Sequence, residues 1–258
     1  MNRPLSEKPI IALGSWLASP AGSYVRRWEE ARLAALTSDI FGFNAVQIGL
    51  PEINGLAASR MPHRWVAHTG MPHDRTLQAI VMHDFCELPF ATQSLDLVVL
   101  PHVLEFAHEP HQILREVERV LIPEGQLIVT GFNPASLWGA RQVAARLTSR
   151  QFLPQSGELI SVPRLKDWLK LLNMEVHPGH FGCYAPPCET ERWLQRFDFM
   201  ERTGKRWWPF LGGVYIVHAI KRVKGMRLIG PAFNRKKAGA RQRVPATNKH
   251  INQKNEHG

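Results

Sequence analysis

The most constraining feature of the sequence is a strand–helix–strand segment in the middle of the chain. Residues 95–100 (LDLVVL) form a short apolar run typical of a buried strand, and residues 111–121 place their apolar side chains on one face of a helix. A Pro-Glu-Gly turn at 123–125 follows, and residues 126–130 then form a second strand. Because a strand pair joined through a helix is normally parallel, this segment predicts a βαβ unit.

The same alternation of strands and helices extends over most of the chain. Further strands are expected at residues 45–48, 64–69, 77–82, 174–177 and 214–220, and further helices at residues 24–36 and 163–172. An apolar stretch at residues 10–18 is interpreted as a docking segment. This order predicts an α/β fold with a doubly wound, mostly parallel sheet that helices cover on both faces.

The positive charge of the chain is concentrated at its carboxyl end. The net charge is +10, but from Lys221 onward there are eleven Lys and Arg against one acid, Glu256, so the preceding body has 21 bases and 21 acids. After Val223 the apolar pattern fades, which predicts a tail that cannot bury enough surface to fold. We therefore expect a docking or lid segment at residues 1–40, the α/β domain at 41–223 and a basic, disordered tail at 224–258.

The cysteines and histidines do not suggest a disulfide framework or a metal centre. Cys86, Cys183 and Cys188 are odd in number and contain no CxxC pair, which fits a reducing compartment and a cytoplasmic protein. Three histidines recur every five residues from His63, a period that suits neither one helix face nor one strand face. We therefore expect no metal, and the apolar stretch at 10–18 is too short to span a membrane.

Four motifs follow one another between Asp84 and Thr130. They are an Asp-x-x-x-Leu-Pro-Phe turn, an Asp-Leu-Val strand, a His-Val-Leu-Glu segment, and a Leu-Arg-Glu-x-x-Arg-Val-Leu-x-Pro-x-Gly helix and turn. In order and spacing this segment resembles the type 11 branch of the class I S-adenosylmethionine-dependent methyltransferases. The resemblance implies a Rossmann-like, seven-stranded sheet whose last strand, near residues 213–220, is antiparallel. It also implies S-adenosylmethionine as the cofactor.

The resemblance further implies a donor site at the carboxyl ends of the strands. Where the family shows Asp-x-Gly-x-Gly, the chain reads QIGLPEING from residue 47, so that of the two glycines only Gly49 is clearly retained. Asp84 stands at the family position that meets the adenine amine, and Phe85 is placed to cover the ring. The residues implied in cofactor binding are Gln47, Gly49, Leu50, Asp84, Phe85, Leu100, Pro101 and His102.

Three of these residues also have a purely structural interpretation. Asp84 can be a turn carboxylate that accepts backbone N–H groups, and Gly49 can be needed only to end a strand. His102, or Glu105, can act as a general base, although packing or capping at the start of a helix would also explain them.

The acceptor pocket is expected around the segment that follows residue 132. Trp138, Phe152 and Tyr184 are the candidate lining residues, and packing of an aromatic lid onto the sheet is the alternative for each.

Three functions remain open on the sequence alone. The first is methyl transfer from S-adenosylmethionine to a small-molecule acceptor. The second is a non-catalytic scaffold or regulator that keeps the fold without donor binding, which the eroded glycine turn favours. The third is an RNA methyltransferase anchored by the basic tail. A nicotinamide dehydrogenase is disfavoured because no GxGxxG follows the first strand.

Overall fold

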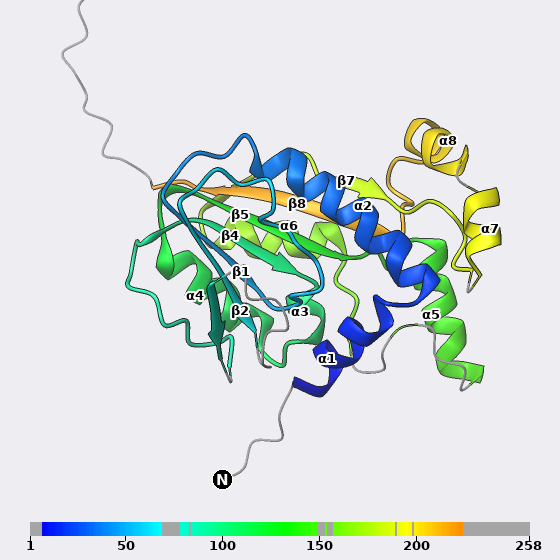
Figure 1. Cartoon of the computed structure of the whole chain (residues 1–258), viewed down its shortest axis with the longest axis horizontal. Helices are drawn as coiled ribbons and strands as arrows, with labels where there is room; N and C mark the ends of the chain where they lie inside the picture. Colours follow the sequence, from blue (N-terminus) through cyan, green and yellow to red (C-terminus); the bar gives the residue numbers. More distant parts are fainter. Residues whose placement is uncertain are drawn as a thin grey trace, which may run out of the picture. The chain divides into compact units, whose positions relative to one another are not determined.

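The computed structural model describes residues 7–68, 78–82, 84–148, 153, 157–188, 190–197 and 199–223. The basic segment predicted to be a tail therefore lies outside the described residues. Within the described part of the chain, no helix is long and apolar enough to cross a membrane. In chain order (Figure 1) the elements are α1 (Glu7–Trp16), α2 (Pro20–Thr37), β1 (Asn44–Ile48), β2 (His63–His68), β3 (Gln78–Val81), β4 (Leu95–Pro101), α3 (Val103–Phe106), α4 (Pro110–Val120), β5 (Leu121–Phe132), α5 (Leu137–Thr148), α6 (Val162–Leu171), β6 (Met174–Val176), β7 (His180–Gly182), α7 (Glu191–Arg196), α8 (Phe199–Trp207) and β8 (Val214–Lys221).

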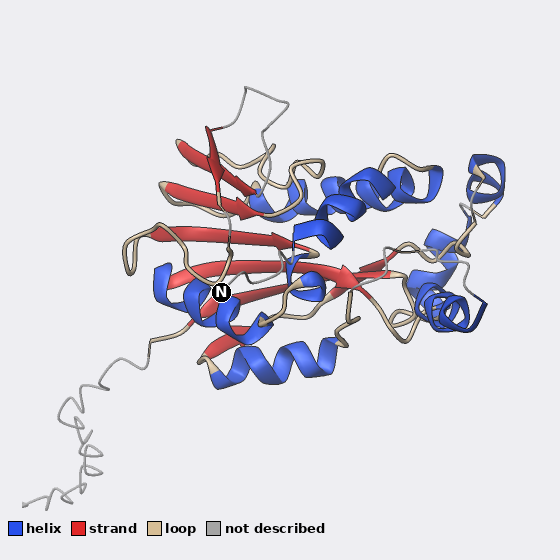
Figure 2. Cartoon of the chain, turned by 90° about the horizontal axis from the view of Figure 1, so that it is seen from below, coloured by secondary structure: helices blue, strands red, loops and turns tan. Residues whose placement is uncertain are grey.

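The strands lie side by side in one mixed sheet (Figure 2). Their order is β3-β2-β1-β4-β5-β8-β6, with β7 also paired to β8. The first five strands are mutually parallel, whereas β8 is antiparallel to β5, β6 and β7. The predicted fold class, including an antiparallel last strand, is therefore confirmed.

The outer edge of β8 differs from the expected seven-stranded sheet. Two short strands share this edge: β6 pairs with residues 219–221 and β7 with residues 214–216. The chain between them contains Pro178, which lacks an N–H group and cannot donate to a strand ladder. One strand position is thus divided in two, and the described residues form a sheet of eight strands.

Helices cover both faces of the sheet, as two polar contacts demonstrate. On one face, a guanidinium nitrogen of Arg32 in α2 lies 2.7 Å from Nδ1 of His180, which pairs with Ile216 of β8. On the other face, Lys221 Nζ donates to the Glu118 carbonyl of α4 at 2.6 Å. Ile216 and Lys221 are five residues apart on one strand, so their side chains point to opposite faces. The sheet is therefore doubly wound.

Asp96 joins the beginnings of two neighbouring strands. Its Oδ2 accepts hydrogen bonds from the backbone N–H groups of Phe43 at 3.0 Å and Asn44 at 2.9 Å. These donors stand just before and at the start of β1, whereas Asp96 belongs to β4, so the carboxylate fixes the register of the two strands. The acid of the Asp-Leu-Val motif therefore acts on the backbone of β1.

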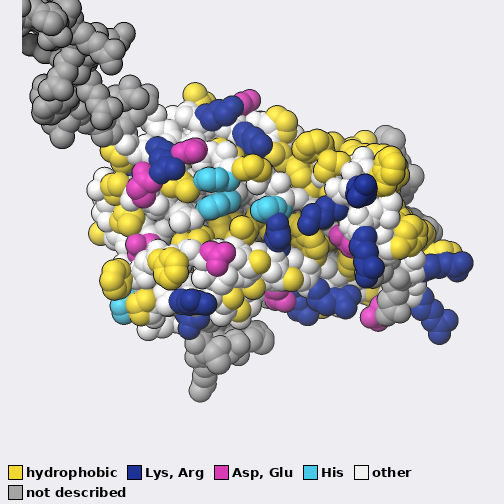
Figure 3. All heavy atoms as spheres, turned by 90° about the horizontal axis from the view of Figure 1, so that it is seen from above, with side chains coloured by type: hydrophobic (Ala, Val, Ile, Leu, Met, Phe, Trp, Pro, Cys, Tyr) yellow, Lys and Arg dark blue, Asp and Glu magenta, His cyan; other side chains and the backbone are white. Residues whose placement is uncertain are grey.

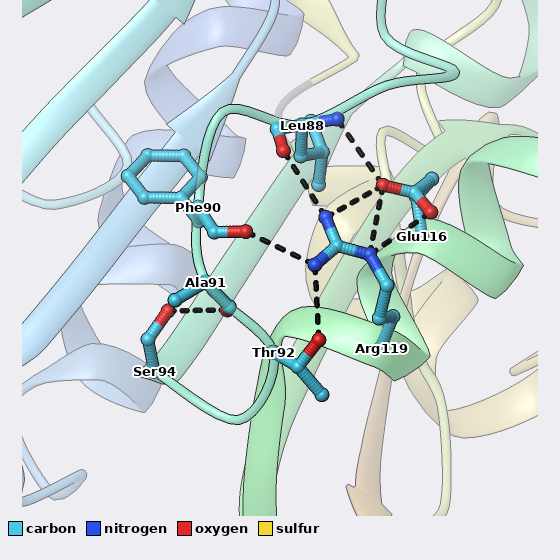
Figure 4. A network of polar contacts seen from close by, with 7 residues as sticks. All are labelled: Leu88, Phe90, Ala91, Thr92, Ser94, Glu116 and Arg119. Carbon is cyan, nitrogen blue, oxygen red and sulfur yellow. Dashed lines mark hydrogen bonds and ion pairs between the residues drawn. The ribbon is translucent and has the colours of Figure 1, made fainter.

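Arg119, in the Leu-Arg-Glu-x-x-Arg motif, holds the loop that connects β3 to β4 (Figure 4). Its guanidinium donates to the carbonyl oxygens of Leu88 at 3.1 Å and Phe90 at 3.0 Å, and to Glu116 Oε2 at 2.8 Å. Glu116 Oε2 also accepts the N–H of Leu88 at 3.2 Å. One planar, multidentate cation thus ties helix α4 to the Leu-Pro-Phe turn.

We expect Arg119→Met to lower the free energy of unfolding by about 1–2 kcal/mol, because two backbone carbonyls lose a charged donor at a half-buried site. Arg119→Lys should restore little of the lost unfolding free energy, because an ammonium cannot reproduce the planar, multidentate hydrogen bonding of the guanidinium. Urea unfolding measures both changes. Arg164→Met is the matched control, because Arg164 pairs with Glu158 in an exposed ion pair. A loss as large in the control as in Arg119→Met would contradict the assignment.

Candidate functional site

The turn after β1 and the end of β4 meet at the carboxyl edge of the parallel strands. Gly49 has a left-handed backbone with φ of 88°. A Cβ atom at this position would lie 2.6 Å from Val103 Cγ2, 3.2 Å from Ile10 Cδ1 of α1, and 3.8 Å from the carbonyl oxygen of Pro101. The position therefore requires glycine for both conformation and space.

Gln47 fixes the shape of this turn from beneath. Its side chain is buried, and Nε2 donates to the carbonyl oxygens of Leu50 at 2.8 Å and Ile53 at 2.7 Å, while Oε1 accepts the N–H of Gly55 at 2.9 Å. Leu50 and Ile53 themselves are buried in the core. The side-chain amide of Gln47, which stands where the family has an aspartate, thus hydrogen-bonds to the loop that follows it.

His102 occupies the centre of a buried polar cluster at the end of β4. It has a left-handed φ of 53° and a fully buried side chain. Its Nδ1 lies 2.8 Å from Glu105 Oε2, and its Nε2 lies 2.9 Å from Glu29 Oε1. Glu105 Oε1 accepts the N–H of Phe132 at 2.6 Å. The cluster therefore joins α2, the end of β4, α3 and the end of β5.

The electrostatics of the cluster make His102 a cation. Burial lowers the pKa of His102, but the carboxylates of Glu29 and Glu105 outweigh this effect and raise the pKa to about 10. Burial raises the pKa of Glu105, against the influence of His102 and the Phe132 N–H. An imidazolium that donates from both nitrogens has no lone pair with which to accept a proton. Both ring nitrogens of His102 are thus engaged by carboxylates, and a role as general base stays a prediction.

One carboxylate oxygen of the cluster remains unsatisfied. Glu29 Oε2 is buried and has no hydrogen-bond partner within the described residues. Glu29 was not predicted as a site residue, although it follows Val25 by four residues and precedes Leu33 by four, on the apolar face of the predicted helix. An acid on the buried face of an amphipathic helix was the signal that could have revealed it.

Asp84 and Phe85 follow β3 and stand in the loop that Arg119 holds. Asp84 is exposed, and its Oδ1 accepts the N–H of Cys86 at 2.8 Å, as expected of a turn carboxylate. Phe85 is half-buried and packs against the hydrophobic core. Both residues lie at the same edge of the sheet as Gly49. Leu100 and Pro101, the last two residues of β4, are buried.

Two of the three aromatic residues predicted to line an acceptor pocket make hydrogen bonds within the framework. Trp138 is buried, and its Nε1 donates to the Ala185 carbonyl at 2.8 Å. The Tyr184 hydroxyl donates to the Pro209 carbonyl at 2.8 Å. Phe152 lies outside the described residues. These contacts agree with the alternative of aromatic packing, and they leave the acceptor-lining role of Trp138 and Tyr184 a prediction.

The described ranges contain no group of three or more His, Cys, Asp or Glu residues that could hold a metal ion.

The candidate site consists of the Gly49 turn, the Asp84 loop and the cluster around His102.

Comparison with known proteins agrees with this architecture. The family model described as a methyltransferase domain matches residues 62–129, which contain the four motifs. The sheet order, the antiparallel last strand and these motifs define the class I methyltransferase fold. The chain belongs to the methyltransferase family of this fold, in its type 11 branch. The uncharacterized protein YafS of Escherichia coli strain K12 is 36% identical over 175 residues, covering 67% of this chain and 70% of YafS.

Solved structures share the fold at low sequence identity. The methyltransferase in a Haloferax volcanii complex with the activator Trm112 aligns with a TM-score of 0.59 and 16% identity, over 84% of this chain and 99% of that chain. A methyltransferase from Thermotoga maritima aligns with a TM-score of 0.57 and 15% identity, over 77% and 92% of the two chains. These similarities show the fold, and they carry no information about the methyl acceptor.

The cluster predicts an unusual pH dependence. In an unfolded chain a histidine titrates near 6.5, so the stability gained from protonated His102 is complete below about pH 6.5 and is lost as the pH rises to about 10. An NMR titration should show the His102 ring still charged at pH 8. Glu29→Gln should lower the pKa of His102 and narrow the pH range over which unfolding free energy falls. A His102 resonance that titrates near 6.5 in the unsubstituted protein would refute this prediction.

We also expect Gly49→Ala to lower the free energy of unfolding by about 2–4 kcal/mol. Alanine would be strained in the left-handed backbone conformation, and its Cβ atom would clash with Val103. Gly179→Ala is the control, since a Cβ there would lie 3.4 Å from its nearest neighbour, the Ile216 carbonyl oxygen, which is an ordinary contact. Thermal or urea unfolding of the two variants measures the difference, and equal losses would contradict the tight approach at Gly49.

Proposed function

We propose that this protein transfers the methyl group of S-adenosylmethionine to a small-molecule acceptor at the carboxyl edge of its sheet. The observation that carries the proposal is the buried, unsatisfied Glu29 Oε2 at the edge where the Gly49 turn and the end of β4 converge. In an open doubly wound sheet, ligands bind at this edge, next to the switch point between β1 and β4.

The residues at this edge fit a cationic donor. S-adenosylmethionine carries an ammonium and a sulfonium, and the sulfonium supplies the electrophilic methyl group. A buried carboxylate oxygen without a partner is costly, and a cationic ligand group beside Glu29 would satisfy it. In this proposal the Gly49 backbone faces the methionine part, Asp84 meets the adenine amine, and Phe85 covers the ring.

Catalysis at such a site depends on alignment. Methyl transfer is an in-line displacement, so holding donor and acceptor in line supplies most of the acceleration. His102, fixed by Glu29 and Glu105, holds the end of β4 against α2 and the end of β5. Leu100, Pro101 and His102 then form a rigid floor for the transfer. Removal of a proton from the acceptor is not assigned to His102.

The domain boundaries follow from this proposal. We propose residues 41–223 as the methyltransferase domain, and residues 7–40 of the predicted 1–40 segment as a cover for its carboxyl edge. Two contacts support the cover: Ile10 of α1 approaches Gly49, and Glu29 of α2 contacts His102.

Calorimetric titration with S-adenosylmethionine and S-adenosylhomocysteine tests the proposal. We expect micromolar binding, weakened at least tenfold by Asp84→Ala through the lost adenine contact. Glu29→Gln should weaken S-adenosylmethionine more than S-adenosylhomocysteine, because only the former carries the sulfonium charge. Asp39→Ala, a change of another exposed Asp at the end of α2, is the matched control. Circular dichroism confirms that each variant is folded.

A second function, that of a non-catalytic scaffold, is favoured by the Gly49 turn itself. Gln47 ties the turn to its own loop, and Ile10 and Val103 lie against the face that a ligand would approach. The same titration separates the two functions. A folded protein that binds neither compound at millimolar concentration would support the scaffold and eliminate methyl transfer by the isolated chain.

A further inference from the structure

A cluster of exposed aromatic side chains lies on α7, α8 and the segment that leads into β8. Six large apolar side chains there are 48–71% exposed, although most side chains of this size are buried in folded proteins. They are Trp193, Phe199, Trp207, Trp208, Phe210 and Leu211. Every residue from Lys205 to Leu211 is exposed. We call this set the aromatic surface.

The backbone beneath the aromatic surface is fixed. Asn133 Nδ2 donates to the carbonyl oxygens of Phe210 at 2.8 Å and Gly212 at 3.0 Å. The Tyr184 hydroxyl donates to the carbonyl of Pro209 at 2.8 Å. These bonds anchor the backbone at residues 209–212, directly after Trp207 and Trp208. Trp207, Trp208 and Phe210 are 54–71% exposed on and beside this anchored segment.

Basic residues surround the aromatic surface. Residues 191–211, from the start of α7, contain five bases and three acids. All five bases are exposed: Arg192, Arg196, Arg202, Lys205 and Arg206. One of the acids, Glu201, is occupied by hydrogen bonds from Tyr24 and from the N–H of Tyr184. Figure 3 shows Lys, Arg and hydrophobic side chains together at the end of the molecule that carries α7 and α8.

We infer that the aromatic surface binds the headgroup region of an anionic lipid bilayer. Tryptophan favours the membrane interface, where its ring is buried and its N–H group stays hydrated. Phenylalanine and leucine insert their apolar side chains beside it, and nearby Lys and Arg bind acidic headgroups. A second copy of the chain is a poorer occupant, because its own five bases would repel the surface. Single-stranded RNA requires stacking rings along a basic groove, whereas here the bases flank an uninterrupted apolar tip at 207–211.

The position of the aromatic surface determines which edge of the sheet would face the bilayer. The segment after α8 enters β8 at Val214, which pairs with Phe132 at the end of β5. Because β5 is parallel to β4, the aromatic surface stands at the same edge of the sheet as Pro101. A chain bound through Trp207 and Trp208 therefore holds the candidate site close to the bilayer. The inference does not depend on donor binding and is tested without the donor.

Co-sedimentation of the full chain with vesicles tests the inference. We expect binding to vesicles of phosphatidylcholine with about one third phosphatidylglycerol, and at least tenfold weaker binding to phosphatidylcholine alone. Trp207→Ser with Trp208→Ser should abolish binding to both. Lys205→Gln with Arg206→Gln should weaken binding to the anionic vesicles about fivefold per charge, the factor for a basic residue near an anionic surface.

Two control variants separate this surface from other sources of binding. Phe41→Ser with Phe43→Ser removes two exposed aromatic side chains before β1, at the opposite edge of the sheet, and should leave binding unchanged. The triple variant Arg235→Gln, Lys236→Gln and Lys237→Gln tests the basic segment after Val223. In a protein that carries these three changes, the two tryptophan changes should still abolish vesicle binding.

Three outcomes would overturn the inference. The first is vesicle binding that survives the two tryptophan changes. The second is tighter binding to a single-stranded RNA oligonucleotide than to anionic vesicles, lost in the same tryptophan variant. The third is a stable dimer in sedimentation velocity that the tryptophan changes dissociate. Circular dichroism of each variant excludes unfolding as the cause of lost binding.

Discussion

The contact on which the carboxyl edge depends is the buried imidazolium of His102 between two carboxylates. Each partner comes from a different element, Glu29 from α2 and Glu105 from α3, and Glu105 in turn holds the end of β5. Removing one member would leave a buried charge without compensation, which costs far more than the intact cluster contributes. The cluster therefore fixes both the position of α2 over the sheet and the conformation at the end of β4.

The sheet could be predicted from the sequence because its strands are short apolar runs separated by turns. The strands at residues 95–100 and 126–130 could be predicted from their apolar composition alone. The long apolar stripe of α4 identified the helix that connects them. The elements at the far end of the chain could not be found in this way. Helices α7 and α8 are only six and nine residues long, shorter than the window of about 11–18 residues over which a helical apolar period can be recognised. Strand β7 is three residues long, and only its pairing with β8 reveals it.

Candidate site residues could be named from the sequence where they belong to a recognisable motif. They were harder to interpret where contacts between distant elements decide the role of the residue. Gly49 and Asp84 could be singled out from the turns that contain them. The role of His102 could not, because one of its two carboxylate partners, Glu29, stands 73 residues away. Arg119 shows the same limitation. Its motif was recognised, but its bonds to the Leu-Pro-Phe loop became visible only in three dimensions.

The central place of β8 has a consequence for how the chain reaches its native state. This strand is last in the sequence of the sheet, yet it lies between β5 on one side and β6 and β7 on the other. During synthesis, β1 to β5 can assemble while the hydrogen-bonding edge of β5 still awaits a partner, and β6 and β7 have no strand to join until Val214–Lys221 emerges. Closure of the sheet is consequently a late, long-range event. Until it happens, the unpaired edge of β5 is open to pairing with another chain.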